Sequence, residues 1–429
     1  MGINRPCKRG NKRKVMKFKA NVWKFNLKTL IIVMIAGLSF SSNAITLQQK
    51  RRLEKKRKQA RLERAQQKKA ENKKEKEEEK ALYSKSLLTG EFTSWGLDPE
   101  RKNSSIRLSQ AWQKFKKKKD VIVAVIDTGI DPNHPFLADN LYIPNANASK
   151  KAFGVDFSKH KVSKFTPIDT HGHGTHVSGI IKSVFPDVKI LTLKYYSLNA
   201  SGQDNLNSTI EALRYAVKAN VDIINYSGGG PESSREELQI LKEAEKKGIL
   251  VIAAAGNEGA NIDIKEHKYF PASYGLKNMV NVTAHDQSVK LLSSSNYGRK
   301  TVDISAPGYR IKSSIPHGRA GYLTGTSQAT AFVSGVAALI KANFPELSAT
   351  QIRSILRESA SKDLKLMGKT STGGKLNASA ALELATSRYE NIREVAMAKK
   401  KQAKKKKLIN TPSKQGPGKI IYRDVSAKK

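Results

Sequence analysis

Short apolar runs that alternate with helix-forming segments are the feature that most limits the fold of this chain. Amphipathic patterns typical of helices, such as 207–219 and 235–247, separate several of the runs. The strand-like runs are Val121–Ile126, Lys189–Leu193, Val221–Asn225, Ile249–Ala255 and Val280–Thr283. Strands that alternate with helices predict a parallel sheet covered on both faces. We therefore expect an α/β protein.

Two polar residues follow strand-like runs, Asp127 directly and Asn257 after one glycine. Asp127 comes after the first run and Asn257 after the fourth. Sheets of this kind bind ligands at the carboxyl ends of their strands, so both residues are expected on the rim that carries a site. An unpaired carboxylate at the end of a buried strand is costly, which indicates a partner for Asp127.

Three motifs place an Asp, a His and a Ser in that order along the chain. Asp127 lies in VIVAVIDTGID, His173 in HGHGTHVSG and Ser327 in GTSQATAFVSGVAAL. A serine hydroxyl is a weak nucleophile that needs a base within hydrogen-bond reach, and the base needs a group that fixes its tautomer. The three residues are therefore candidates for a nucleophile, a general base and its orienting carboxylate.

Other interpretations of the same residues stay open at this point. Asp127 is also suited to cap a turn, and Ser327 to cap a helix that covers 329–342. His171, His173 and His176 have a spacing that could bind zinc, although no Asp, Glu or Cys set completes such a site.

The motifs closely resemble those of the subtilisin-like serine proteases, over roughly residues 93–388. The resemblance implies a three-layer α/β/α fold, in which the middle layer is a mostly parallel, doubly wound sheet of about seven strands. It also implies a serine endopeptidase in which Asp127 orients His173, the general base, and Ser327 is the nucleophile. Asn257, in AAAGNEG, would donate its side-chain N–H to the oxyanion beside the amide of Ser327.

The resemblance suggests substrate-binding residues as well. Ser227, Gly228 and Gly229 would form one wall of a cleft, and Ser201 and Gly202 the opposite wall. An extended peptide between the walls would be held by main-chain hydrogen bonds.

Several positions depart from the family pattern or carry a further expectation. Ala331 and Phe332 stand where the family usually has Pro-His, and Tyr269 stands where a small residue is common, which predicts a shallow primary pocket. The segment Phe270-Pro271-Ala272 resembles a loop with a cis proline. The chemistry requires no cofactor and no metal site is predicted; a structural calcium ion is an open alternative that the sequence does not predict.

The N-terminal segment has the pattern of a secretory signal peptide. Basic residues precede the apolar run 30–40, and Ser42-Asn43-Ala44 suits cleavage after Ala44. We expect residues 1–44 to form the signal, with Met16 as a possible true start, and the protein to be secreted or periplasmic. An uncleaved anchor is the alternative.

Charge is concentrated at the two ends of the chain. Of the net charge of +41, residues 1–80 carry +18 and residues 389–429 carry +10. We interpret residues 45–92 as a charged Lys/Glu-rich spacer or atypical propeptide, 93–388 as the catalytic domain and 389–429 as a basic tail. The basic ends are either solvated or contact polyanions or membrane surfaces.

Polypeptides are the expected partners, with no specific nucleic acid and a monomeric state. A binding protein on a protease scaffold, or acyl transfer to an amine in place of hydrolysis, remains an alternative function. The one cysteine, Cys7, excludes an intramolecular disulfide.

Overall fold

The computed structural model describes residues 49, 51–70, 90–143, 152–161 and 163–409. The chain divides into two units, Met1–Glu78 and Glu79–Lys429. In the first, residues 51–70 form an exposed helix. The expected signal peptide, including Met16, lies outside the described residues, as do 71–89 of the spacer and 410–429 of the tail.

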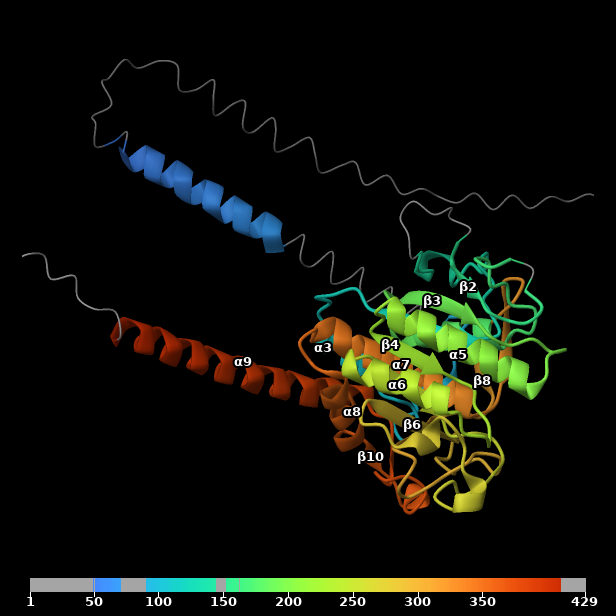
Figure 1. Cartoon of the computed structure of the whole chain (residues 1–429). Helices are drawn as coiled ribbons and strands as arrows, with labels where there is room; N and C mark the ends of the chain where they lie inside the picture. Colours follow the sequence, from blue (N-terminus) through green and yellow to red (C-terminus); the bar gives the residue numbers. More distant parts are fainter. Residues whose placement is uncertain (1–48, 50, 71–89, 144–151, 162, 410–429) are drawn as a thin grey trace, which may run out of the picture. The chain divides into compact units, whose positions relative to one another are not determined.

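A nine-stranded sheet in the order β10-β11-β7-β6-β5-β4-β1-β3-β2 forms the centre of the second unit (Figure 1). Seven of these strands correspond to the expected parallel sheet: β1 Ile122–Asp127, β2 Gly154–Asp156, β3 Lys189–Lys194, β4 Ile223–Tyr226, β5 Leu250–Ala254, β6 Met279–His285 and β7 Ile304–Pro307. Two-residue strands extend one edge, β11 (Gly374–Lys375) parallel to β7 and β10 (Ser361–Lys362) antiparallel to β11.

Helices cover both faces of the sheet, which confirms the three-layer α/β/α architecture. Alternate side chains of β1 show the division, because Val123 and Val125 belong to one apolar cluster and Ala124 and Ile126 to another. The first cluster includes residues of α3 (Leu108–Lys114), α4 (His173–Val184), α7 (Thr326–Asn343), α8 (Ala349–Glu358) and α9 (Ala378–Ile409). The second includes α5 (Gly202–Lys218) and α6 (Arg235–Lys246), which lie side by side in Figure 1.

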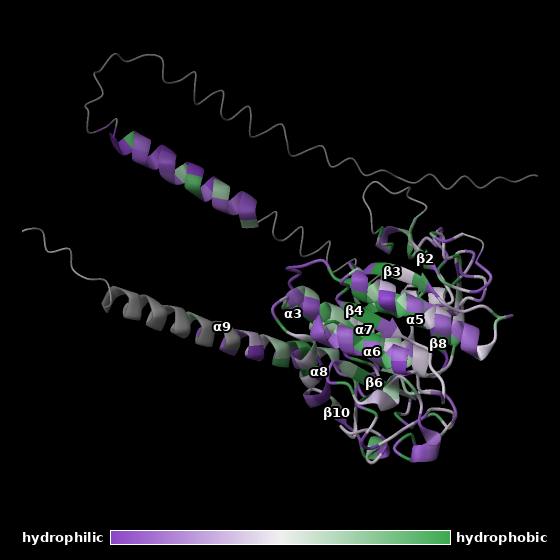
Figure 2. Cartoon of the chain, viewed as in Figure 1, coloured by the Kyte–Doolittle hydropathy of each residue, from purple (hydrophilic) through white to green (hydrophobic). Residues whose placement is uncertain are grey.

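The composition of each helix explains its position. All residues of α7 except Lys341 are buried, as expected for a helix that is apolar or small on every side. The helices α5 and α6 bury one stripe only, and Figure 2 shows hydrophilic residues at intervals along both. The result places α7 inside the molecule and α5 and α6 at its surface.

Other elements connect these layers. An antiparallel pair, β8 (Ile311–Ile315) and β9 (Arg319–Leu323), packs against α4. Short 3-10 helices are η1 Trp95–Leu97, η2 Ala138–Asn140, η3 Lys265–His267, η4 Ala272–Tyr274 and η5 Leu364–Leu366. The strand β11 is followed within three residues by α9, which starts at Ala378.

The last helix continues past the expected end of the catalytic domain at residue 388. Tyr389 packs against Phe344 with ring centroids 5.3 Å apart, and the Lys118 ammonium group lies 4.3 Å from the Tyr389 ring centroid. The catalytic unit therefore uses part of the segment interpreted as tail. Among the described helices, none has the length and hydropathy required to cross a membrane.

Candidate active site

Asp127 and His173 form a close pair at the carboxyl end of the sheet. Asp127 ends β1 and His173 begins α4, and the distance from His173 Nδ1 to Asp127 Oδ1 is 2.7 Å. The Asp127 side chain is only 3% exposed, whereas that of His173 is 23% exposed. A carboxylate beside Nδ1 favours the tautomer with its proton there, which leaves Nε2 as the basic nitrogen.

The electrostatics of this pair favour a protonated imidazole. Burial lowers the pKa of His173, but the charge and hydrogen bond of Asp127 and the charge of Asp169 more than offset it. The pKa of His173 is therefore raised above its ordinary value of 6.5. An imidazolium formed during a reaction would be stabilised in the same way.

Asp169 organises the loop that presents His173. Its Oδ1 accepts hydrogen bonds from the main-chain N–H of Gly172 at 2.7 Å and from the Thr128 hydroxyl at 2.9 Å. Its Oδ2 accepts from the main-chain N–H and hydroxyl of Thr175. Burial alone would raise the pKa of Asp169, but these hydrogen bonds lower it. The motifs in the sequence did not reveal this residue, whose only signal is an Asp four positions before His173.

Ser327 is the second residue of α7 and is 6% exposed. Its hydroxyl donates to the carbonyl oxygen of Ser227 at 2.9 Å. The structure gives no hydrogen bond between Ser327 and His173, both of which are described. Hydrogen bonds between catalytic groups are often long or misaligned without substrate, so this geometry does not argue against a nucleophile.

Asn257 lies next to the start of α7. Its Oδ1 accepts from the main-chain N–H of Thr326 at 2.9 Å and from the Thr326 hydroxyl at 3.2 Å. Because a main-chain N–H can donate only to the oxygen of the side-chain amide, this contact determines which end of the Asn257 amide faces Thr326. The Nδ2 group is therefore the end that remains to donate to a bound molecule.

The segment Ser227–Gly229 is held by neighbours on several elements. Asn225 donates to the Ser227 hydroxyl at 2.8 Å and accepts from Ser334 of α7 at the same distance. Gly229 has φ +151°, and a Cβ there would lie 2.3 Å from the carbonyl oxygen of Phe270. This close approach requires glycine.

Main-chain groups of this wall remain available. Gly230 exchanges two hydrogen bonds with Phe270, whereas no hydrogen bond of Gly228 or Gly229 is found among the described residues. Tyr269 crowds the same segment, because a Cβ at Gly229 would lie 2.6 Å from its ring. The Phe270–Pro271 peptide bond is cis, as the resemblance implied.

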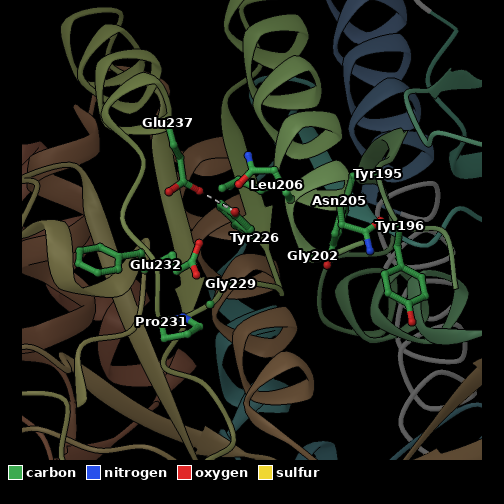
Figure 3. Close-up of a pocket in the computed structure, with 13 residues that line it drawn as sticks. Tyr195, Tyr196, Gly202, Asn205, Leu206, Tyr226, Gly229, Pro231, Glu232 and Glu237 are labelled. Carbon is green, nitrogen blue, oxygen red and sulfur yellow. Dashed lines mark hydrogen bonds between the residues drawn. The ribbon is translucent and has the colours of Figure 1, made fainter. Parts of the chain in front are cut away.

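The second expected wall is the start of α5. The Ser201 side chain caps this helix by accepting from the main-chain N–H of Asp204, and Gly202 is the first helical residue. A cavity of about 620 Å³ is lined by both Gly202 and Gly229 (Figure 3). The two walls inferred from the sequence therefore border one cavity.

The three neighbouring histidines do not converge. His176 is fully buried and its Nε2 lies 2.9 Å from the carbonyl oxygen of Ile311. The His171 ring packs against Tyr196, with centroids 5.5 Å apart, and lies edge-on to the His173 ring at 6.3 Å. Within the described part of the chain no three His, Cys, Asp or Glu side chains form a group that could hold a metal ion. The zinc interpretation does not fit these residues.

Comparison with known proteins identifies the family. A family model described as the subtilase family matches residues 118–396. The chain belongs to the subtilase family. Relatives include the major intracellular serine protease of Bacillus subtilis (strain 168), 37% identical over 55% of this chain and 73% of that protein. The thermophilic serine proteinase of Bacillus sp. (strain AK1) is 35% identical over 54% of each chain.

Solved structures of subtilases agree with this assignment. A cold adapted subtilisin-like serine proteinase superposes with a TM-score of 0.51 and 28% identity over 60% of this chain and 88% of its own. A structure of the subtilase cytotoxin SubAB assembly gives a TM-score of 0.56 and 26% identity over 66% and 95%. The chain is thus a subtilisin-like serine protease, a serine-type endopeptidase that acts on polypeptides.

One departure from the subtilase pattern has a packing explanation. Phe332, where the family usually has His, is fully buried in the core. A Cβ at Gly96 would lie 2.9 Å from the Phe332 ring and 3.0 Å from Pro307. The aromatic ring therefore fills space against η1 and β7.

Proposed function

We propose that Asp127, His173 and Ser327 hydrolyse peptide bonds through an acyl-enzyme intermediate. The observation that carries the assignment is the 2.7 Å contact between His173 Nδ1 and the buried Asp127 carboxylate. It supplies a base whose tautomer and orientation are fixed before substrate binds.

The reaction follows from the residues present. His173 Nε2 removes the proton from Ser327 Oγ as the oxygen attacks the scissile carbonyl carbon. The protonated His173 then gives that proton to the leaving amine, and the acyl group stays on Ser327. His173 then takes a proton from water as the water attacks the ester, the acyl–Oγ bond breaks to release the carboxylic acid, and His173 returns the proton to Ser327 Oγ.

Two donors are assigned to the oxyanion. The main-chain N–H of Ser327 lies in the first turn of α7, where N–H groups have no partner within the helix and the helix dipole favours negative charge. The Nδ2 group of Asn257 is the second donor, because its Oδ1 is already bound to Thr326. Both groups would stabilise charge that develops only in the transition state.

The substrate is assigned an extended conformation between the two walls. The available main-chain groups of Gly228 and Gly229, together with the start of α5 at Gly202, support binding by strand addition. Main-chain recognition favours unfolded segments and exposed loops. The chemistry is assigned no cofactor.

Hydrolysis of a fluorescently labelled denatured protein by the full chain tests this function. Wild type should cleave the substrate, the Ser327→Ala variant should not, and Ser379→Ala, on α9, where the hydroxyl donates to exposed Glu383, should retain activity. Product masses distinguish hydrolysis from acyl transfer to an amine. A folded wild type that cleaves nothing, or a Ser327→Ala variant that retains activity, would contradict the assignment.

The assignment to a secreted or periplasmic location rests on the sequence. It is supported by the apolar run 30–40 and by Ser42-Asn43-Ala44. The Bacillus subtilis relative is intracellular by name, so location needs its own measurement. Cell fractionation and the mass of the mature N-terminus should show an extracytoplasmic protein that begins after Ala44.

The basic ends are assigned an electrostatic role, which is contact with polyanions or anionic membrane surfaces. The enzyme is assigned a monomeric state. The +10 charge of residues 389–429 and the exposed helix 51–70 support it. A truncation should remove 400–429 and keep Tyr389, which packs against Phe344. Salt-sensitive retention on a polyanion column should fall in this variant, and unchanged retention would exclude the tail as the binding segment. Light scattering would report the oligomeric state.

A further inference from the structure

A buried carboxylate lies beside the cavity between the two substrate walls. Glu237, in the first turn of α6, is 1% exposed. Its Oε1 accepts from the Tyr226 hydroxyl at 2.6 Å and its Oε2 from the Tyr274 hydroxyl at 2.7 Å. Figure 3 shows the Glu237 carboxylate directed toward Tyr226 at one side of the cavity.

This carboxylate has no cationic partner in the described part of the chain. Its hydrogen-bond partners are neutral, and no Lys, Arg or His side chain forms an ion pair with it. Burial raises the pKa of Glu237, and the two tyrosine hydrogen bonds offset this only in part. Buried carboxylates in proteins are normally paired, so one that borders a cavity is suited to receive a cation from outside.

The rest of the cavity suits a long side chain with a charged end. Tyr195, Tyr196, Leu206 and Phe270 supply apolar or aromatic lining, and a second carboxylate, Glu232, also belongs to the lining. Its volume of about 620 Å³ lies in the range of ligand pockets. Aromatic and apolar walls accommodate the methylene stem of Lys or Arg while a carboxylate binds the head group.

We propose that this cavity binds a Lys or Arg side chain of the polypeptide substrate, with Glu237 as the residue that determines the preference. The inference rests on the proposed function, because Gly202 and Gly229 line the cavity and also belong to the two walls assigned to the substrate. None of Asp127, His173 and Ser327 lines it. The selected substrate residue therefore lies away from the bond that is cleaved.

Quenched fluorescent peptides test the proposal with the full-length wild-type chain. Each peptide carries Lys, Arg, citrulline, norleucine or Glu at one position, and the other positions stay fixed. At one position away from the cleaved bond, Lys and Arg should give a kcat/KM about ten- to hundredfold above norleucine, the gain expected for a charged hydrogen bond. Citrulline has the shape of Arg without its charge and should lose most of this gain.

A pair of neighbouring variants separates the role of Glu237 from general charge. Glu237→Gln keeps the size of the side chain and should lower the ratio of the Lys to the norleucine kcat/KM by about tenfold or more. Glu236→Gln is the control, because Glu236 is exposed and pairs with Arg214 outside the cavity. It should leave the ratio unchanged.

Each possible result bears on the proposal. Hydrolysis by wild type with no cationic preference at any position, or equal rates for Arg and citrulline, would overturn it, whether or not the variant folds. A preference that persists in a folded Glu237→Gln variant would overturn the role of Glu237. If wild type hydrolyses neither these peptides nor denatured protein, the proposed function fails and this inference fails with it.

Discussion

The hydroxyl of Thr128 donates to the carboxylate of Asp169 across 2.9 Å. Thr128 follows Asp127 at the end of β1, and Asp169 lies four residues before His173. Thr128 also accepts the main-chain N–H of Gly174. Two further hydrogen bonds therefore join the end of β1, which carries Asp127, to the segment that carries His173. They act in addition to the Asp127–His173 contact.

We expect Asp169→Asn to impair this arrangement. Asn retains one acceptor oxygen, so either the contacts at Oδ1 or those at Oδ2 are lost. The expected result is a fall in kcat of about tenfold to a hundredfold, with KM nearly unchanged.

The pH profile distinguishes positioning from a general structural role. The charge of Asp169 raises the pKa of His173, so its removal should move the acid limb of kcat/KM to lower pH. Asp187→Asn, an exposed carboxylate beside Lys117, is the control. A loss of stability and rate with an unshifted acid limb would show that Asp169 only holds the loop together.

The pH dependence of wild type follows from the raised pKa of His173. His173 must be neutral to act as a base, so kcat/KM should fall as pH decreases through a midpoint above 6.5. In Asp127→Asn the midpoint should shift to lower pH because burial then dominates. The kcat of that variant should fall by about 10⁴, the factor known for the corresponding change in another Ser-His-Asp enzyme. A wild-type midpoint below 6.5 would contradict this account.

Asn257→Ala should lower kcat more than it changes KM. Loss of the equivalent side-chain donor in subtilisin, a member of the same family, lowers kcat by about 10²–10³, and a fall of similar size is expected here. The Ser327 main-chain N–H remains, so activity should be reduced and still measurable. Asn133→Ala, an exposed asparagine, serves as the matched control. A fall below about tenfold would argue against Asn257 as an oxyanion donor.

The fold should lose stability as pH decreases from 6.5 toward 4. Burial lowers the pKa of His176 to about 4, so the unfolded chain binds a proton near pH 6.5 that the folded chain does not bind. This contribution of His176 to stability is fully present above pH 6.5 and should decrease by about 1.4 kcal/mol per pH unit below it. His285, whose pKa burial lowers to about 3, adds a second such contribution.

Denaturant unfolding of the Ser327→Ala chain at several pH values checks this prediction without self-cleavage. Replacement of His176 by Gln in the same background should lower stability at neutral pH and make the pH dependence shallower. An identical slope with and without His176 would contradict the assignment of this buried imidazole.

The sequence predicted the main strands because each is a continuous apolar run of the length expected for a strand buried on both faces. Shorter elements gave no such pattern. The strand β2 has three residues and β10 and β11 have two each, and β11 lies directly before the helix-forming sequence of α9. Tertiary pairing with β7 decides the conformation of that segment.

The residues of the candidate site also differ in how clearly the sequence predicts them. Asp127, His173 and Ser327 lie in distinctive motifs, whereas Asp169 is one acidic residue in a loop, and its role depends on a distant threonine. Glu237 lies in the charged helical sequence REELQILKEAEK, where glutamate usually indicates a solvated face. Only the folded chain shows that this glutamate points inward to Tyr226 and Tyr274.

Two of the residues proposed for catalysis and two of those proposed for substrate selection lie on helices that cover opposite faces of the sheet. His173 and Ser327 lie in the first turns of α4 and α7, which pack on one face of the sheet, whereas Gly202 and Glu237 belong to α5 and α6 on the other. If Glu237 has the proposed role, a change on α6 should alter substrate preference while α4 and α7, on the other face, keep their packing. The helical residues proposed to select the substrate and those proposed to cleave it therefore belong to different layers.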